Sequence, residues 1–495
     1  MAKRTGFGKS VVLYSIAGIS TQVVNFFLLP VYTTYLNTSD YGILEVVTMF
    51  ISFFIHFVIL GSDQAIGRMY FEEEKEGFSF KKYLRTIVAF IIVWGLLLCG
   101  VLTLFGEQVF GFIFPGVSFS RYLIFGVWGT FLASFTTMYV LLMSAKEIHS
   151  RRVLINLMKS FFMIGLILVF LVGFKWGVFS NVLGIFIAEL IFGVFSFYAL
   201  FRLINFRLGF HYKYLRMSLA FSVPFMFFNI GGTLRNITDR IILLNMLSTS
   251  EVGLYAMGYK FGMIVSIFMT AWYTTYKFRY MRIFADDDKD KDLIVSRLNH
   301  VYVLTIGFIF LGVSAFTPFV IFILTTSQFH ESYVVAPWIA MTFLINGFGR
   351  MPTTQILFQR KTKYLTLVVF FGLVVNVIFS IILIKTFGYV GAAIGTFISQ
   401  LATMLVYLFI SNSMHRYKMD MRFFIQVVVL IGSWAILSFI FPNITLINFI
   451  IKLIIFSFTI FILWILMGRW EKNYFWGSMR ENIQKIRKLF GLVSK

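Results

Sequence analysis

The chain has 495 residues, of which 59% are hydrophobic and 13% charged, and its mean hydropathy is +0.86. These values exclude an ordinary soluble domain, in which about 25% of the residues are charged. The net charge of +22 raises the question of nucleic-acid binding. Its meaning depends on where the basic residues lie relative to the apolar segments.

Apolar stretches long enough to cross about 30 Å of hydrocarbon as a helix recur along the whole chain. They predict about 14 helices, at residues 10–35, 41–67, 84–105, 121–143, 153–172, 177–201, 217–247, 251–276, 299–325, 333–349, 364–384, 388–411, 423–441 and 445–467. The first stretch lacks the cleavage pattern of a signal peptide, so we expect it to stay in the mature protein. The only cysteine, Cys99, lies inside the third stretch and rules out an intramolecular disulfide. The predicted fold class is all-α and polytopic.

The basic residues outside these stretches lie almost entirely on one side of the predicted membrane. With the N-terminus in the cytoplasm, the external loops hold only Arg121, Lys175 and Lys385. This positive-inside pattern places both termini in the cytoplasm of an inner or plasma membrane. Acidic lipid headgroups account for the positive charge, so we expect membrane lipids as partners and no nucleic acid.

An internal repeat has a spacing of 211 residues. LNTSDYGIL at 36–44 corresponds to LSTSEVGLY at 247–255, and GIFIAEL at 184–190 corresponds to GTFISQL at 395–401. Gly177 and Arg68 fall on Gly388 and Arg279 in the same register. The repeat predicts two six-helix lobes in the same membrane orientation, an arrangement typical of alternating access around a central cavity.

The predicted domains follow from this repeat. They are an N-terminal lobe at 1–205, a C-terminal lobe at 213–411, two further helices at 412–468 and an amphipathic cytoplasmic tail at 469–495. The two matching stretches at 36–44 and 247–255 are predicted to be the same external turn in each lobe. The repeat supplies both walls of a cavity, so we expect a monomer.

Four segments carry a resemblance to a known family. FLLPVYTTYLNTSDYG, RMYFEEE, DRIILLNMLSTSEVGLY and FGYVGAAIGTFISQ resemble the bacterial polysaccharide transporters, a family that includes O-antigen and teichoic-acid flippases. The family lies in the superfamily of multidrug and toxin extruders and lipid II flippases. The resemblance implies two six-helix lobes, and a substrate in which undecaprenyl pyrophosphate carries an oligosaccharide. It also implies a possible partnership with polysaccharide polymerase machinery.

Basic residues inside spans are candidates for shielding a pyrophosphate, because a buried charge is costly and usually faces a cavity. The span at 217–247 holds Arg235, Asp239 and Arg240, and we assign a hinge in it to Pro224, Gly231 and Gly232. Alternatively, Arg235 and Asp239 only neutralise each other as an i, i+4 pair.

Three lysines inside spans differ in depth. Lys260 lies deep enough to line the cavity, with packing against a carboxylate as the alternative, whereas Lys159 lies near the cytoplasmic end and can either bind substrate or reach water. Lys452, outside the repeat, is expected to extend its amine to the membrane surface.

Three arginines at cytoplasmic helix ends are candidates for pyrophosphate capture, because a guanidinium binds phosphate oxygens with two hydrogen bonds. They are Arg68, Arg279 and Arg350. Ordinary positive-inside anchoring explains them equally well.

Two carboxylates, Glu189 and Asp239, are candidates for coupling transport to protons. Glu189 is replaced by Gln400 in the second repeat. Glu45 and Asp63 are weaker candidates, and His56 is interpreted as a hydrogen-bonded core histidine.

Other functions fit the sequence less well. The charged loop FRYMRIFADDDKDKDLIVSRLN reads as a solvated linker, and the six histidines lack metal-ligand spacing, so neither an enzyme nor a cofactor is expected. A multidrug antiporter would be expected to bind cations with carboxylates. A lipid II flippase would share the preference for an anion and stays an alternative.

Overall fold

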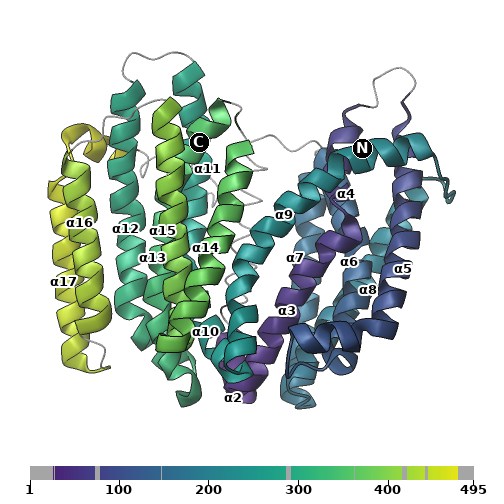
Figure 1. The fold of residues 1–495 in the computed structure, drawn as a ribbon, viewed down its shortest axis with the longest axis horizontal. Coiled ribbons are helices and arrows are strands. Elements are labelled where there is room, and N and C mark those ends of the chain that lie inside the picture. Colours follow the sequence, from purple (N-terminus) through teal and green to yellow (C-terminus); the bar gives the residue numbers. More distant parts are fainter. Residues whose placement is uncertain are drawn as a thin grey trace, which may run out of the picture. The chain divides into compact units, whose positions relative to one another are not determined.

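A computed structural model describes residues 26, 28–72, 78–146, 148–285, 291–359, 361, 363–414, 421–440 and 444–477 (Figure 1). Within these residues every regular element is a helix. Thirteen of the described helices are long and apolar enough to cross a bilayer, and they coincide with predicted spans two to fourteen. The predicted span 10–35 lies mostly outside the described residues, which include its last part as α2 (Leu29–Tyr35).

The remaining elements have the following bounds. They are α3 (Thr38–Ile59), α4 (Ser62–Tyr70), α5 (Phe80–Ile113), η1 (Phe119–Leu123), α6 (Ile124–Ala145), α7 (His149–Leu168), η2 (Val169–Gly173), α8 (Val178–Leu203), α9 (Tyr212–Met246), α10 (Thr249–Gly262), α11 (Ile264–Ala285), α12 (Lys291–Leu324), η3 (Ser327–Val334), α13 (Val335–Phe358), α14 (Lys363–Phe387), α15 (Tyr389–Met414), α16 (Met421–Ala435), η4 (Ile436–Ile440) and α17 (Leu446–Ile465).

The helix bounds follow the register of the sequence repeat. The starts of α5 and α12 (80 and 291) and their ends (113 and 324) both differ by 211 residues. The same holds for the starts and ends of α8 and α15. Gly177 and Gly388, which precede α8 and α15, have positive φ angles of 58° and 57°. Glycine is preferred there because other residues are strained in this conformation.

The chain packs as two compact units, which differ from the predicted lobes. Unit 1 comprises residues 1–256 with 384–392, and unit 2 comprises 257–383 with 393–495. In unit 1, α6 packs against α8 and α3, and α9 packs against α3, α4 and α5. In unit 2, α12 packs against α11, α13, α16 and α17 around a core of buried Tyr, Phe, Leu and Val side chains. The predicted lobe boundaries remain a prediction about the repeat.

Two local expectations are wrong. The predicted span 41–67 is broken into α3 and α4 at Leu60 and Gly61, both of which have left-handed backbone conformations. The predicted charged linker is mostly helical, because α11 continues to Ala285 and α12 begins at Lys291. The buried Tyr280 packs this extension of α11 against Phe358 of α13, so charge alone did not mark a loop there.

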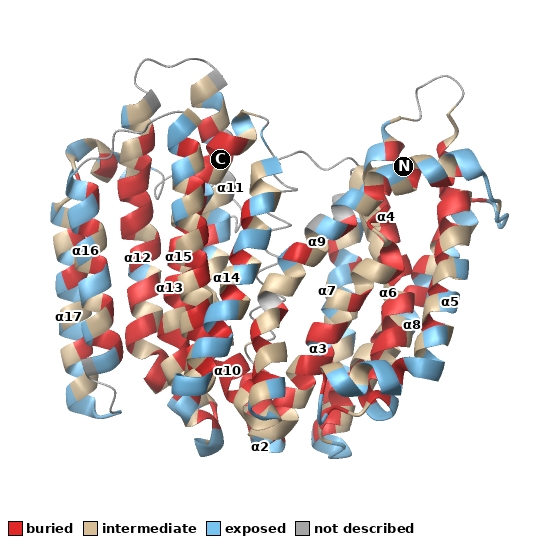
Figure 2. Ribbon diagram, viewed as in Figure 1, coloured by how far each residue is buried: buried red, intermediate tan, exposed pale blue. Residues whose placement is uncertain are grey.

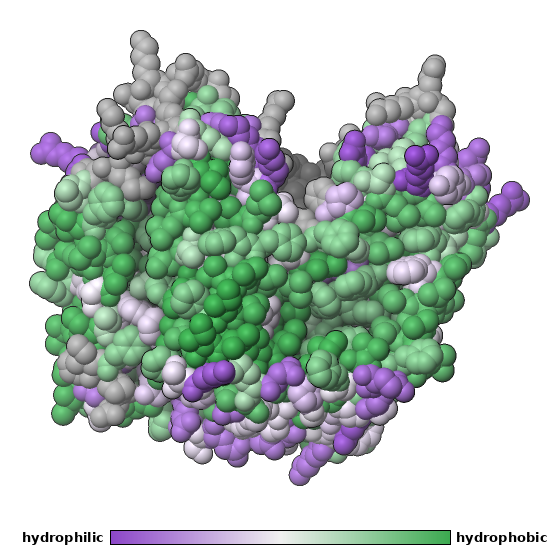
Figure 3. Space-filling model, in the orientation of Figure 1, coloured by the Kyte–Doolittle hydropathy of each residue, from purple (hydrophilic) through white to green (hydrophobic). Residues whose placement is uncertain are grey.

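Burial separates interior from peripheral helices. In the most apolar part of Phe119–Ala145, 67% of residues are buried, against 17% in Leu446–Ile465 (Figure 2). Within each unit, the face drawn in Figure 3 is hydrophobic along the helices and hydrophilic at both ends. Exposed apolar helix sides between polar ends are what a bilayer requires, and the chain is a multi-pass membrane protein.

Candidate functional site

A buried cluster of charged and phenolic side chains lies where α3, α9 and α10 meet in unit 1. Arg240 Nε lies 4.0 Å from Glu45 Oε2, and these two side chains are only 11% and 12% exposed. The Tyr255 hydroxyl donates to Asp239 Oδ2 at 2.7 Å, and the Arg240 guanidinium lies 5.7 Å from the centre of the Tyr255 ring. The guanidinium is thus held beside the Glu45 carboxylate and the Tyr255 ring, which lowers the cost of burying it.

The two repeated turns hold this cluster in place at one end. Thr38 Oγ1 lies 2.6 Å from Ser250 Oγ, and Ser39 Oγ lies 2.6 Å from Thr249 Oγ1. Since Thr38 corresponds to Thr249 and Ser39 to Ser250, the two bonds are related by exchange of the repeats. The two turns therefore pair with local two-fold symmetry.

Glycine makes this pairing possible. A Cβ on Gly42 would collide with the carbonyl of Thr249, and a Cβ on its repeat counterpart Gly253 would collide with the carbonyl of Thr38. Asn37 caps α3 by accepting from the Asp40 amide at 2.8 Å, which fixes the start of the helix. The opening motif of each repeat is thus a contact surface for the other.

Further contacts run along α9 toward its other end. His56 Nε2 lies 2.9 Å from Thr233 Oγ1, which supports the interpretation of His56 as a hydrogen-bonded histidine. Gly61 (φ +69°) lies so close to α9 that a Cβ would meet the Ser222 carbonyl. Ser222 is two residues before Pro224, which lies inside a continuous α9.

The proposed hinge in α9 includes Pro224 and the glycine pair. Figure 1 shows α9 changing direction along its course. Gly232 is exposed, and a Cβ there would meet nothing within 4 Å. The hinge role of Pro224, Gly231 and Gly232 stays a prediction.

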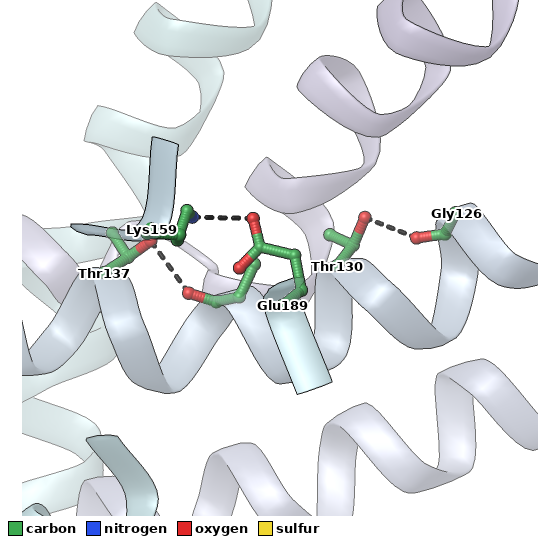
Figure 4. A network of polar contacts seen from close by, with 6 residues as sticks. Gly126, Thr130, Thr137, Lys159 and Glu189 are labelled. Atoms are coloured by element: carbon green, nitrogen blue, oxygen red, sulfur yellow. Dashed lines mark hydrogen bonds and ion pairs between the residues drawn. The ribbon is translucent and has the colours of Figure 1, made fainter. Parts of the chain in front are cut away.

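Lys159 and Glu189, assigned separately to substrate binding and coupling, form one ion pair between α7 and α8. Lys159 Nζ lies 2.6 Å from Glu189 Oε1, with side-chain exposures of 24% and 13%. Figure 4 shows the pair beside α6, which carries Thr130 and Thr137. Glu189 Oε2 is buried and accepts no hydrogen bond from the described residues. In this conformation each charge is neutralised by the other.

The three arginines proposed for capture each lie over an aromatic ring. The Arg68 guanidinium is 4.6 Å from the Phe221 ring centre, and its Nε is 3.7 Å from Glu72 Oε1. Arg279 is 4.8 Å from the Tyr474 ring, and Arg350 is 5.1 Å from the Tyr273 ring. All three are exposed. Part of the guanidinium edge is already engaged in two of them, because Arg279 donates to the Tyr474 hydroxyl and Arg350 donates to Asn346 Oδ1, each at 3.2 Å. An anion would bind these arginines through their other N–H groups or by displacing the present partners.

The remaining candidates are divided between the units. Arg235 is half-buried in α9 of unit 1, and Lys260 is half-buried near the end of α10 in unit 2. The structure thus brings Asp239 and Arg240 to the same tyrosine, Tyr255, and brings Lys159 and Glu189 together. Arg279, Arg350 and Lys260 belong to unit 2.

The expectation for Lys452 is wrong. This side chain is fully buried in α17, where its amine donates to the Ala315 carbonyl at 3.3 Å and lies 5.7 Å from the Phe319 ring. Ala315 precedes Pro318 by three residues in α12. Packing of α17 on α12 closes the route by which the amine could have reached the membrane surface.

Sequence reasoning missed the side chains that position the charges. Tyr255, Thr233 and Tyr474 are uncharged and were not singled out. The only available signal for Tyr255 was its place in the second copy of the repeated turn. Among the described residues, no group of three or more His, Cys, Asp or Glu side chains could hold a metal ion.

Comparison with known proteins identifies the relatives. Residues 7–277, more than half of the chain, match the family model described as polysaccharide biosynthesis protein. None of the curated protein sequences is significantly similar to the chain.

Solved structures share the fold, and three of them serve as examples. The lipid II flippase MurJ in an inward closed conformation has a TM-score of 0.68 and 15% identity, covering 94% of this chain and 99% of its own. A multidrug resistance MATE family transporter in an inward-facing conformation has a TM-score of 0.66 and 13% identity, covering 82% and 98%. A MOP superfamily transporter from Pyrococcus furiosus has a TM-score of 0.57 and 15% identity, covering 83% and 96%. The expected fold is confirmed.

Proposed function

The chain belongs to the family of polysaccharide biosynthesis proteins, and we propose that it is a flippase for an undecaprenyl-pyrophosphate-linked oligosaccharide. The lipid moves from the cytoplasmic to the external leaflet of the inner or plasma membrane, with both termini in the cytoplasm. Family membership supports the substrate class, and the likeness to transporter folds supports a transport mechanism. No chemical bond of the substrate changes in this process, so the proposed role is not enzymatic.

Buried Arg240 carries the proposal. A cation held inside a membrane-spanning helix usually marks a substrate or ion path. Arg240 is 9% exposed and lies 4.0 Å from Glu45. A pyrophosphate, which carries more charge and more acceptor oxygens than a carboxylate, competes with Glu45 for this guanidinium.

Asp239 has a different role in this mechanism. Its carboxylate accepts from the Tyr255 hydroxyl at 2.7 Å, which ties Asp239 to α10. When substrate leaves, Glu45 again neutralises Arg240. Protonation of Glu45 would remove this competitor, so Glu45 joins Asp239 and Glu189 as a coupling candidate.

The paired turns provide the external closure of the transport path. Two hydroxyl pairs at 2.6 Å and the close approach of Gly42 and Gly253 hold α3 against α10. Separation of these turns would open the external side. Arg68, Arg279 and Arg350 are proposed to capture pyrophosphate at the cytoplasmic side, and Lys260 and Arg235 to line the path.

The experiment that tests this function uses purified protein in proteoliposomes with a fluorescent undecaprenyl-pyrophosphoryl oligosaccharide. The fraction moved between leaflets is measured for wild type, Arg240→Ala, Arg240→Lys and the exposed control Lys213→Ala. We expect Arg240→Ala to lose at least tenfold in rate, Arg240→Lys to retain part of it, and Lys213→Ala to match wild type.

Two outcomes would contradict the proposal. One is protein-dependent movement that is unchanged in Arg240→Ala, and the other is movement of a cationic drug in place of the lipid. The same vesicles with lipid II distinguish the lipid II flippase, because that substrate would then move faster than the oligosaccharide lipid.

A further inference from the structure

Within unit 2, the segment that follows α17 packs against α11 and α12 through stacking of aromatic rings on arginines. Residues 469–477 are helical. The ring of Trp470 lies 5.3 Å from the Arg297 guanidinium, and the ring of Tyr474 lies 4.8 Å from that of Arg279. The two rings are themselves parallel, with centres 5.2 Å apart and an interplanar angle of 4°. One face of the segment therefore presents a continuous aromatic surface to two cations of α11 and α12.

A buried carboxylate fixes the start of this segment. Glu471 is only 3% exposed, and its Oε2 lies so close to Gly468 that a Cβ at that position would collide with it. The same Cβ position lies 3.5 Å from an Arg422 guanidinium nitrogen. A buried carboxylate beside a guanidinium is costly to displace alone, so the segment has a defined docking site rather than a loose surface contact.

The repeat shows what is particular about Arg279. Its counterpart Arg68 stacks on Phe221, which belongs to α9, and has Glu72 as its counter-charge. Arg279 stacks instead on Tyr474 and donates to its hydroxyl at 3.2 Å. Tyr474 lies outside both repeats and after the last membrane-spanning helix, so its side chain can turn away from Arg279 while Glu471 keeps the start of the segment in place.

We propose that residues 469–477 form a clasp that withholds Arg279 from phosphate-bearing ligands until such a ligand displaces Tyr474. The Tyr474 hydroxyl accepts from an N–H group of the guanidinium edge that a phosphate would otherwise use, and the stacked ring holds the hydroxyl there. Phosphate is anionic and the Tyr474 hydroxyl is neutral, so a phosphate-bearing ligand binds Arg279 more strongly than Tyr474 does. The affinity of the ligand is nevertheless lowered, because it must first displace Tyr474. The clasp thus sets a threshold for capture at the end predicted to be cytoplasmic. This inference rests on the proposed role of Arg279 as an anion site.

Calorimetric titration of inorganic pyrophosphate into the full-length protein, in a detergent with an uncharged headgroup, tests the clasp. We expect Tyr474→Ala to bind about tenfold more tightly than wild type, equivalent to about 1.4 kcal/mol. Tyr474→Phe, which keeps the ring and loses the hydroxyl, is expected to gain about threefold. Asn473→Ala, an exposed neighbour on the same segment, is the matched control and should equal wild type. The gain in pyrophosphate affinity should vanish in the double variant that carries both Arg279→Ala and Tyr474→Ala.

Binding by Tyr474→Ala that is equal to or weaker than that of wild type would overturn the clasp, as would an absence of pyrophosphate binding in both proteins. Repeating the titration in nanodiscs with neutral or anionic lipids separates the two sources of phosphate. If only anionic lipids abolish the difference between wild type and Tyr474→Ala, the displacing ligand is a lipid headgroup.

The clasp and the flippase function fail separately. If Arg279→Ala loses oligosaccharide transport and Tyr474→Ala does not bind pyrophosphate more tightly, the capture role of Arg279 is supported and the clasp is refuted. If Tyr474→Ala binds pyrophosphate more tightly only when Arg279 is present, and Arg279→Ala transports normally, the clasp is supported and Arg279 does not belong to the transport path.

Discussion

The ion pair of Lys159 and Glu189 allows a quantitative prediction. Removing one partner of a fully buried pair costs about 3–5 kcal/mol, because the other charge is left without compensation. Here the side chains are 24% and 13% exposed, so the remaining charge is partly hydrated. We therefore expect Lys159→Met and Glu189→Gln each to lower the free energy of unfolding by about 2–3 kcal/mol. The double variant leaves no uncompensated charge and should lose only about 1–2 kcal/mol.

A double-mutant cycle on the free energy of unfolding in detergent measures this coupling, and Lys213→Met, an exposed lysine of α9, serves as the control. For this 2.6 Å contact, the two single losses less the loss in the double variant correspond to a coupling energy of about 3–4 kcal/mol. Single losses that add in the double variant to within about 0.5 kcal/mol would refute the reasoning. Transport by the double variant then separates structure from coupling. If Glu189 carries protons, the double variant stays inactive despite its recovered stability, and if the pair is structural, transport recovers with stability.

Three further predictions concern other contacts. In a Cys99→Ser background, Thr38→Cys with Ser250→Cys should form a disulfide readily, because the two hydroxyl oxygens lie 2.6 Å apart, and closing it should abolish transport until a reductant is added. Gel mobility measures the disulfide and leaflet transfer measures transport. Full transport by the cross-linked protein would show that the turns need not separate. Gly61→Ala should lower the free energy of unfolding by about 2–4 kcal/mol, because the added Cβ meets the Ser222 carbonyl. Gly177 has a similar positive φ but open space around a Cβ, so Gly177→Ala should lower it by only about 1 kcal/mol. Equal losses would mean that contact with the Ser222 carbonyl is unimportant. Lys452→Met should raise the free energy of unfolding by about 1–2 kcal/mol, because the lysine is fully buried and a methionine of similar shape has no charge to desolvate. A lower stability of the variant in thermal unfolding experiments would show that the hydrogen bond of Lys452 to the Ala315 carbonyl outweighs that cost.

The sequence by itself determined the helices, the repeat and the residues that carry charge in the spans. A helix that crosses hydrocarbon must satisfy its own backbone and be apolar for about 20 residues, so composition alone located thirteen described spans. The turn motif that opens each repeat predicted the register of 211 residues that the bounds of α5 and α12 follow.

Only the tertiary structure decided which charges meet. Lys159 meets the opposite charge of Glu189, 30 positions away, and Arg279 meets the neutral Tyr474, 195 positions away. Lipid is as apolar as the protein interior, so an apolar pattern does not show which side of a helix faces a neighbour. Lys452 illustrates this, because its span looks the same whether its amine reaches the membrane surface or the Ala315 carbonyl. The break at Gly61 and the pairing of Gly42 with Gly253 likewise arise from the close approach of helices that only the folded chain brings together.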